Sequence, residues 1–317
     1  MKKLVTNFKV VMLAVLTVSV VSCTDDDDNG GVLDNNNSAY DLTVDNADFT
    51  ILNAALLRTG LDATLDQAGG TFTVFAPTDT AFQTFLSANG FATIDDVPVL
   101  VLRNTLRNHV LGTVARSTDL TDGYVKTSAT NSDGDTLDLY VDLTSGVVLN
   151  GVAEVTMPDV TVDNGVVHVV DEVITLPTIV TLAAANPSFS NLVTAVDQQG
   201  LVATLSDDTA TFTVFAPTND AFQALIDEST TDGLNDISDV LALSNLTDVL
   251  TYHVVSGAAV RAENIVDGAN VDPIGPGTFS ITGTVITDAQ TRDTNIIVTN
   301  VTAINGVVHA IDNVLLP

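Results

Sequence analysis

The stretch that decides the fold is TFTVFAPTDTAFQTFL, residues 71–86, which returns as TFTVFAPTNDAFQALI at residues 211–226. The two copies are 140 residues apart and are identical at 11 of 16 positions, which indicates one domain present twice in tandem. In each copy, β-branched and aromatic residues predict a short buried strand, and the proline that follows ends it because it has no N–H for the ladder. Thr78 and Thr218 are then expected to cap a helix, because a threonine hydroxyl accepts a hydrogen bond from a free backbone N–H.

The similarity extends to both sides of this stretch. Residues 46–86 align with 186–226, and the leading part of each has the apolar spacing of a helix. The later part of each repeat alternates apolar and polar residues, as strands do, and residues 132–135 (SDGD) predict a hairpin tip. Each repeat closes with NGVVH, at 164–168 and 305–309, where Asn-Gly between apolar runs is a strong hairpin signal. We therefore expect helices first and strands last in each repeat.

Composition restricts the possible functions. The chain has 317 residues, enough for two domains, with 10 Lys and Arg against 40 Asp and Glu and a net charge of −30. Such a surface repels nucleic-acid phosphates, and no basic cluster offsets it, so we expect no nucleic-acid binding. A bare anionic lipid surface is disfavoured for the same reason. The single cysteine excludes an intrachain disulfide.

The N-terminal region predicts an exported protein with a lipid anchor. Basic residues precede an apolar stretch at 10–21, which is too short to span a bilayer but suits a signal peptide. It ends in Val-Val-Ser-Cys23, which resembles the lipobox of bacterial lipoproteins, in which the signal is cut before the cysteine and the thiol is acylated. The alternative is an ordinary secretory signal with an incidental cysteine. We expect a signal peptide at 1–22, lipidation at Cys23, and a disordered acidic tether at 23–40.

The acidic run directly behind Cys23 looks like the signal that sends some Gram-negative lipoproteins to the outer face of the cell. The expected location is therefore the outer membrane, with the domains exposed at the surface. Contact with the membrane is expected through the lipid anchor only.

The sequence contains no recognisable catalytic constellation. His168 and His309 alternate with aliphatic residues in the closing strands, which is typical of neutral, hydrogen-bonded core histidines, although metal ligation is the alternative. His109 and His253 end apolar helices and receive the same interpretation. GxSxG, HExxH, CxxC and phosphate-loop motifs are missing from the sequence. We expect no enzyme, no cofactor and no metal.

Two motifs, each present twice, resemble those of the fasciclin (FAS1) family. The first is TFTVFAPT(D/N)xAF at 71–82 and 211–222, and the second is NGVVHxxDxVxxxP at 164–177, with a shorter form at 305–317. The resemblance covers the chain from about residue 41 to its end. Its specificity lies in the order of the two motifs and in their repetition.

The resemblance implies an α+β fold in two tandem domains, at 41–177 and 178–317. Each would be a β-wedge or sandwich of about seven strands with several packed helices. Fasciclin domains occur in secreted or membrane-anchored proteins, where they mediate adhesion to cells, matrix or polysaccharide and are not enzymes.

Adhesion motifs of the family are matched only in part. A Tyr-His pair implicated in integrin binding in animal members is matched by Tyr252-His253, where the first repeat has Asn-His. A Pro-Asp-Ile segment is resembled by Pro158-Asp159-Val160, where the second repeat has Asn-Val instead. The resemblance therefore gives Tyr252, His253, Pro158, Asp159 and Val160 as candidate binding residues, with packing as the alternative for Tyr252.

Three functions follow from these features. The first is a lipid-anchored adhesion or recognition protein that binds an extracellular protein or a polysaccharide. The second is a glycan-binding accessory of a polysaccharide-uptake system, against which stand the lack of Trp and the presence of only 4 Tyr to stack on sugar rings. The third is a structural envelope protein that spaces or stabilises its partners.

Overall fold

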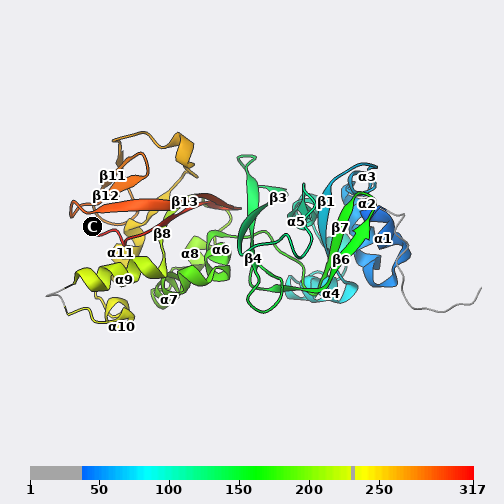
Figure 1. Ribbon diagram of the computed structural model, residues 1–317, viewed down its shortest axis with the longest axis horizontal. Helices are drawn as coiled ribbons and strands as arrows, with labels where there is room; N and C mark the ends of the chain where they lie inside the picture. Colours follow the sequence, from blue (N-terminus) through cyan, green and yellow to red (C-terminus); the bar gives the residue numbers. More distant parts are fainter. Residues whose placement is uncertain (1–37, 230–232) are drawn as a thin grey trace, which may run out of the picture. The chain divides into compact units, whose positions relative to one another are not determined.

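Each repeat is built on one mixed sheet with helices packed against it (Figure 1). The computed structural model describes residues 38–229 and 233–317. The first repeat contains, in chain order, α1 (Ala39–Asp45), η1 (Ala47–Phe49), α2 (Thr50–Thr59), α3 (Asp62–Leu65), β1 (Phe72–Pro77), α4 (Asp79–Ala88), η2 (Ile94–Asp96), α5 (Val99–Asn108), β2 (Val110–Leu111), β3 (Gly123–Thr130), β4 (Thr136–Asp142), β5 (Val148–Leu149), β6 (Ala153–Val162) and β7 (Gly165–Val170).

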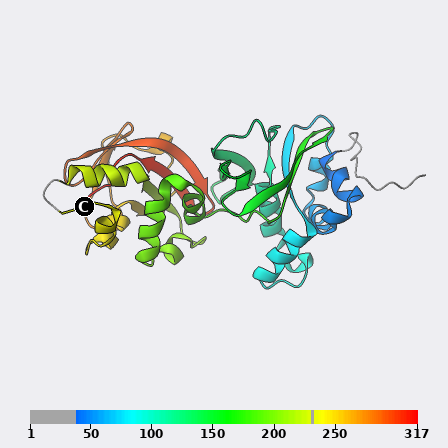
Figure 2. The same ribbon diagram turned by 60° about the horizontal axis from the view of Figure 1, so that its bottom comes forward.

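The second repeat follows the same order of strands and nearly the same order of helices, with α10 in the place of η2 and η4 in addition. It contains α6 (Ile179–Ala185), η3 (Pro187–Phe189), α7 (Ser190–Gln198), α8 (Val202–Leu205), β8 (Phe212–Pro217), α9 (Asn219–Glu228), α10 (Ile237–Leu241), α11 (Leu246–Tyr252), β9 (Val254–Ser256), η4 (Ala262–Asn264), β10 (Asn270–Val271), β11 (Phe279–Thr282), β12 (Val285–Thr287), β13 (Asp293–Ala303) and β14 (Gly306–Ile311). In Figures 1 and 2 its yellow-green helices lie on one side of its orange and red strands. The predicted α+β class is confirmed.

The two sheets have the same topology. The first has the strand order β2-β1-β7-β6-β5-β4-β3, and the second, read from its other edge, has β9-β8-β14-β13-β12-β11-β10. Each is a 7-stranded sheet in which the strand of the opening motif pairs in parallel with the closing strand, β1 with β7 and β8 with β14. All other pairs are antiparallel. The prediction of one fold present twice, with about seven strands in each copy, is confirmed.

The predicted caps and the predicted hairpin tip are also found. The hydroxyl of Thr78 accepts a hydrogen bond from the N–H of Ala81 at 3.2 Å, and Thr218 caps α9 in the same way. Strands β3 and β4 pair from Thr130 to Thr136, and residues 131–135 connect them. The tight turn there needs the left-handed backbone of Gly134, whose φ is 87°.

The start of the first domain differs from the prediction. Ser38 caps α1: its hydroxyl accepts from the N–H of Asp41, and the carboxylate of Asp41 accepts from the N–H of Ser38. Residues 38–40, which the sequence analysis placed in the tether, are therefore the N-cap and the first two residues of α1. Cys23, the predicted signal peptide and the predicted tether up to residue 37 lie outside the described residues.

The closing hairpin forms as expected, but its turn lies one residue earlier than the Asn-Gly pair suggested. Val162 pairs with Gly165, so that the two loop residues are Asp163 and Asn164, and Gly165 is the first residue of β7. The glycine is required by the parallel neighbour, because a Cβ at this position would lie 1.9 Å from the carbonyl oxygen of Phe72. Gly306 faces the carbonyl of Phe212 in the same way, at 2.0 Å.

A buried asparagine side chain joins the first helix of each repeat to its closing strand. The amide of Asn164 accepts from the N–H of Ala39 at 2.9 Å and donates to the carbonyl of Leu65 at 2.6 Å. Asn305 makes the same pair of bonds, from Ile179 at 3.0 Å and to Leu205 at 2.8 Å. Each amide therefore fixes the position of two helices relative to the end of the sheet.

Among the described residues, no single helix is long and apolar enough to cross a membrane. In the part of the chain that the structure describes, one bent pair, α6 with η3 and α7, has the length and composition of a span, with a bend of 106° at the junction.

Replacing the second of these amides is expected to destabilise the fold. Asn305→Ala leaves the N–H of Ile179 and the carbonyl of Leu205 buried without their partners, which costs about 1–3 kcal/mol for each unsatisfied group. Urea unfolding should show a lower midpoint for Asn305→Ala. Asn270→Ala, at an exposed position in β10, is the matched control and should change the midpoint little. Equal midpoints for wild type and Asn305→Ala would refute the assigned role of the amide.

Candidate functional site

The Tyr-His pair of the second repeat lies in the core. The side chain of Tyr252 is 0% exposed, its hydroxyl donates to the carbonyl of Thr278 at 2.7 Å, and its ring packs edge-on against Phe279. The N–H of Ala289 donates to the same hydroxyl at 3.1 Å. In this conformation Tyr252 offers no surface to a partner, and its geometry supports the packing alternative.

His253 is fixed at both ring nitrogens. Its Nδ1 lies 2.7 Å from the carbonyl of Val249, and its Nε2 accepts from the N–H of Leu315 at 2.9 Å. His109 repeats this arrangement in the first repeat, with Thr105 at 2.8 Å and Ile174 at 2.9 Å. The two rings tie the end of a helix to the segment after the closing strand. Burial lowers the pKa of His109 and of His253 to about 4, so both are neutral in the folded protein.

The histidines of the closing strands are also structural. The Nε2–H of His168 donates to the carbonyl of Ala115 at 2.9 Å, its Nδ1 accepts from the N–H of Asp159 at 3.2 Å, and its ring stacks on Phe75. His309 donates to Val260 at 2.9 Å and stacks on Phe215 in the same way. Burial lowers the pKa of His309, which favours the neutral ring. Both positions agree with the predicted core role.

The Pro-Asp-Val segment lies on a bulge in the middle of β6. The pairing with β7 shifts register on both sides of Met157, and Asp159 adopts a φ of +63°. The carboxylate of Asp159 accepts from the N–H of Ser117 at 2.8 Å and from the hydroxyl of the same residue. Burial alone would raise the pKa of this carboxyl, but the two hydrogen bonds from Ser117 lower it. The side chain is thus engaged within the domain and keeps the bulge in its shape.

The outer side of the bulge is apolar. Met157 is 53% exposed and Pro158 is also exposed, whereas Asp159 and Val160 are half-buried. The sequence indicated Pro158 but missed Met157, because a methionine among polar strand residues carries no signal until the bulge is known. A rigid, exposed pair of apolar side chains next to a sheet is a surface that suits contact with a protein partner.

The second repeat has the same bulge in β13. Asn300, with a φ of +60°, takes the place of Asp159, and its side-chain oxygen accepts from the N–H of Ala262 at 2.8 Å. Ile297 and Val298 are exposed at 53% and 43%. The bulge is therefore a property of the fold, and its exposed residues include two apolar side chains in each copy.

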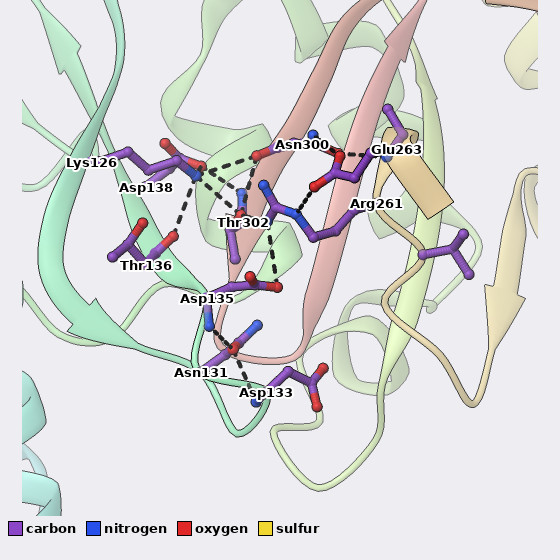
Figure 3. A network of polar contacts seen from close by, with 12 residues as sticks. Lys126, Asn131, Asp133, Asp135, Thr136, Asp138, Arg261, Glu263, Asn300 and Thr302 are labelled. Carbon is purple, nitrogen blue, oxygen red and sulfur yellow. Dashed lines mark hydrogen bonds and ion pairs between the residues drawn. The ribbon is translucent and has the colours of Figure 1, made fainter. Parts of the chain in front are cut away.

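The bulge of the second repeat takes part in a polar network with the first repeat (Figure 3). Lys126 of β3 donates to the carbonyl of Asn300 at 3.3 Å and to the hydroxyl of Thr302 at 3.1 Å. Asp138 of β4 accepts from Lys126 and from the N–H of Thr302, both at 2.6 Å. Burial raises the pKa of Asp138, although both of these donors favour its charged form.

Two further contacts extend this network. Arg261 lies 3.4 Å from Asp135 of the first repeat and 2.7 Å from Glu263 of its own repeat. Tyr124 donates to the carbonyl of Leu182 in α6 at 3.1 Å. The sequence missed the network because its contacts between the repeats join residues that are 58 to 176 positions apart along the chain. The bulge of the second repeat is thus partly engaged by the first repeat, whereas that of the first repeat keeps Met157 and Pro158 exposed.

Within residues 38–229 and 233–317, no group of three or more His, Cys, Asp or Glu side chains is placed to hold a metal ion.

Comparisons with known proteins identify both repeats. The Fasciclin domain profile matches residues 47–177 and 187–317. The transforming growth factor-beta-induced protein ig-h3 of Sus scrofa is 29% identical over 252 residues, which cover 78% of this chain and 35% of that protein. Protein sll1483 of Synechocystis sp. is 39% identical over 144 residues, which cover 44% of this chain and 73% of that protein. The chain thus spans about a third of the length of the ig-h3 protein.

Among solved structures, the FAS1 domain pair of the insect cell adhesion molecule fasciclin I is similar to this chain. The match has a TM-score of 0.48 and 18% sequence identity, and it covers 88% of this chain and 96% of that one.

The buried helix-end histidines are expected to make the protein sensitive to mild acid. Their pKa of about 4 in the folded state lies below the ordinary histidine pKa of 6.5, so the unfolded chain binds more protons between these values. The free energy of unfolding should therefore fall as the pH is lowered from 6.5 towards 4, by about 2 kcal/mol for each histidine at pH 5. Histidine ring resonances followed by NMR should show His109 and His253 neutral at pH 5. Midpoints near 6.5 for both rings would contradict this expectation.

Proposed function

Since this chain belongs to the fasciclin domain family, we propose that it is an adhesion or recognition protein that binds a protein partner outside the cell. One relative of this fold is described as an insect cell adhesion molecule. The observation that carries the proposal is the bulge of β6, where Met157 and Pro158 are exposed on a turn fixed by Asp159 and Ser117. Because the turn is already ordered, little conformational entropy is lost when a partner covers it.

The proposal includes a lipid anchor at Cys23 and a location on the outer membrane with the domains facing outward. The support is the sequence: an apolar stretch that ends at the only cysteine, followed by an acidic run. Two domains on one tether allow two weak contacts to act together, because the second contact forms at a high effective concentration.

A glycan ligand is the second candidate and has less support. Stacking on a sugar ring needs an exposed aromatic face, and none of the four tyrosines of the chain is exposed. A structural envelope role predicts that the same bulge contacts one fixed partner. Recovery of a single stoichiometric envelope protein after cross-linking would favour that role.

The role of the bulge is tested by Met157→Asp. A charge at the centre of an apolar contact must be desolvated on binding, so attachment of cells to surfaces and to neighbouring cells should fall at least threefold. Val152→Asp, at a position that is 60% exposed in the loop before β6, is the matched control and should attach like wild type. The measurement is the fraction of cells retained under flow, with a deletion strain as the lower limit. If the deletion strain attaches as well as wild type, adhesion is not the function.

The anchor is tested by Cys23→Ser. Without a thiol the lipid cannot be attached, so labelled palmitate should no longer be incorporated and the protein should leave the membrane fraction. Protease added to intact cells should remove the wild-type domains, if they face outward. Retention of Cys23→Ser in the membrane fraction would contradict lipid anchoring, and protection of the wild type from protease would contradict surface exposure.

A further inference from the structure

The first repeat contains a cavity that its copy lacks. The cavity has a volume of about 350 Å³, whereas the equivalent space in the second repeat measures about 50 Å³. It lies between the helices α1, α2, α3 and α5 and the strands β1 and β7, and its wall is mostly apolar, with Ala39, Leu52, Leu56, Leu65, Phe72 and Val74 among its lining residues. A volume above roughly 300 Å³ is typical of sites that hold a small molecule.

One cause of the difference is the size of a residue in the first helix. Ala39 lines the cavity, and the equivalent residue of the second repeat, 140 positions later, is Ile179. The backbone N–H of each is held by the buried asparagine of its repeat, so the two side chains start from the same place in the fold. The three additional carbons of isoleucine fill space that alanine leaves open.

The second cause is the position of a phenylalanine ring. Phe72 lines the cavity and is half-buried, whereas Phe212, its equivalent, is 4% exposed and packs in the core. A Cβ at Gly70 would lie 2.3 Å from Cε2 of Phe72, so the ring occupies a position that only glycine permits. The second repeat has Ala210 there, and its methyl group excludes that position for the ring of Phe212.

The opening of the cavity carries a positive charge. Arg107, in the last turn of α5, lines the cavity and is exposed, and no hydrogen bond or ion pair holds its side chain within the described part of the chain. Arg107 lies two residues before His109, and the equivalent residue of the second repeat, two residues before His253, is Thr251. His109 also lines the cavity, but both of its ring nitrogens are already hydrogen-bonded. Arg107 therefore brings an unpaired guanidinium to this site, in a protein whose net charge is −30.

We propose that the first repeat binds a small amphiphile with one apolar tail and one anionic head, of the chemical class of medium-chain fatty acids. The tail occupies the cavity, where it replaces solvent at an apolar wall. The head lies at the opening, where a carboxylate accepts hydrogen bonds from the planar guanidinium of Arg107. The second repeat has neither the space nor the cation, so one molecule binds to each chain.

The experiment is a calorimetric titration of the full chain with decanoate, with decanol as a probe of the tail alone and acetate as a probe of the head alone. Decanoate is expected to bind one per chain, decanol more weakly, and acetate not at all. Three variants copy the second repeat into the first. Ala39→Ile and Gly70→Ala should each weaken the binding of both decanoate and decanol at least tenfold. Arg107→Thr should weaken decanoate at least fivefold and leave decanol unchanged.

Folding is checked in the same samples by thermal unfolding. Gly70→Ala and Arg107→Thr change a half-exposed loop and an exposed side chain, so they remain interpretable if Ala39→Ile does not fold. No saturable binding of decanoate would overturn the proposal. Binding that survives both Ala39→Ile and Gly70→Ala would place the ligand elsewhere and overturn it as well. Equal affinity of wild type and Arg107→Thr for decanoate would refute the anionic head.

Discussion

The fold of each repeat depends on a buried amide that joins its beginning to its end. Asn164 holds the N–H of Ala39, 125 residues earlier, and the carbonyl of Leu65. It directly precedes the strand that pairs in parallel with β1, so the first helix, the opening motif and the closing strand meet around one side chain. An unpaired amide is costly inside a protein, so this side chain specifies a single arrangement of the three segments.

The same closure brings the two domains together. The closing strand β7 is followed closely by α6, the first helix of the second repeat, and only residues 171–178 separate them. The carbonyl of Pro177 accepts from the N–H of Ile304, in the hairpin loop of the second repeat, at 2.8 Å. In the network of Lys126, Asp138 and Thr302, a buried carboxylate accepts hydrogen bonds from both repeats. The ion pair itself lies within the first repeat, and the bond to this carboxylate that crosses between the repeats comes from the N–H of Thr302.

The sequence allowed the repeat, the caps and the closing hairpin to be predicted, because each depends on neighbouring residues. Thr78 caps its helix as its position before a helical pattern indicated. Two features depend on distant segments and could not be read locally. Gly165 is required by the carbonyl of Phe72 rather than by a turn, and the bulge of β6 is fixed by Ser117, 42 residues from Asp159. The exposed Met157 was missed for this reason, and the burial of Tyr252 shows that a two-residue motif does not reveal which side of a helix it occupies.

Two copies of one fold in a single chain separate the residues that build the fold from those that vary on it. Thr78, Asn164 and His168 have identical counterparts with the same hydrogen bonds, so their role is architectural in both repeats. The cavity of the first repeat depends instead on two positions at which the copies differ: Ala39, which lines it, stands against Ile179, and Gly70, which lies beside the ring of Phe72, stands against Ala210. A void of this size in the core lowers stability, since its lining atoms lose contacts. In the second repeat, side chains occupy most of the equivalent space in the core. The open core of the first repeat is therefore not a requirement of the fold, and a ligand that occupies it would restore the missing contacts.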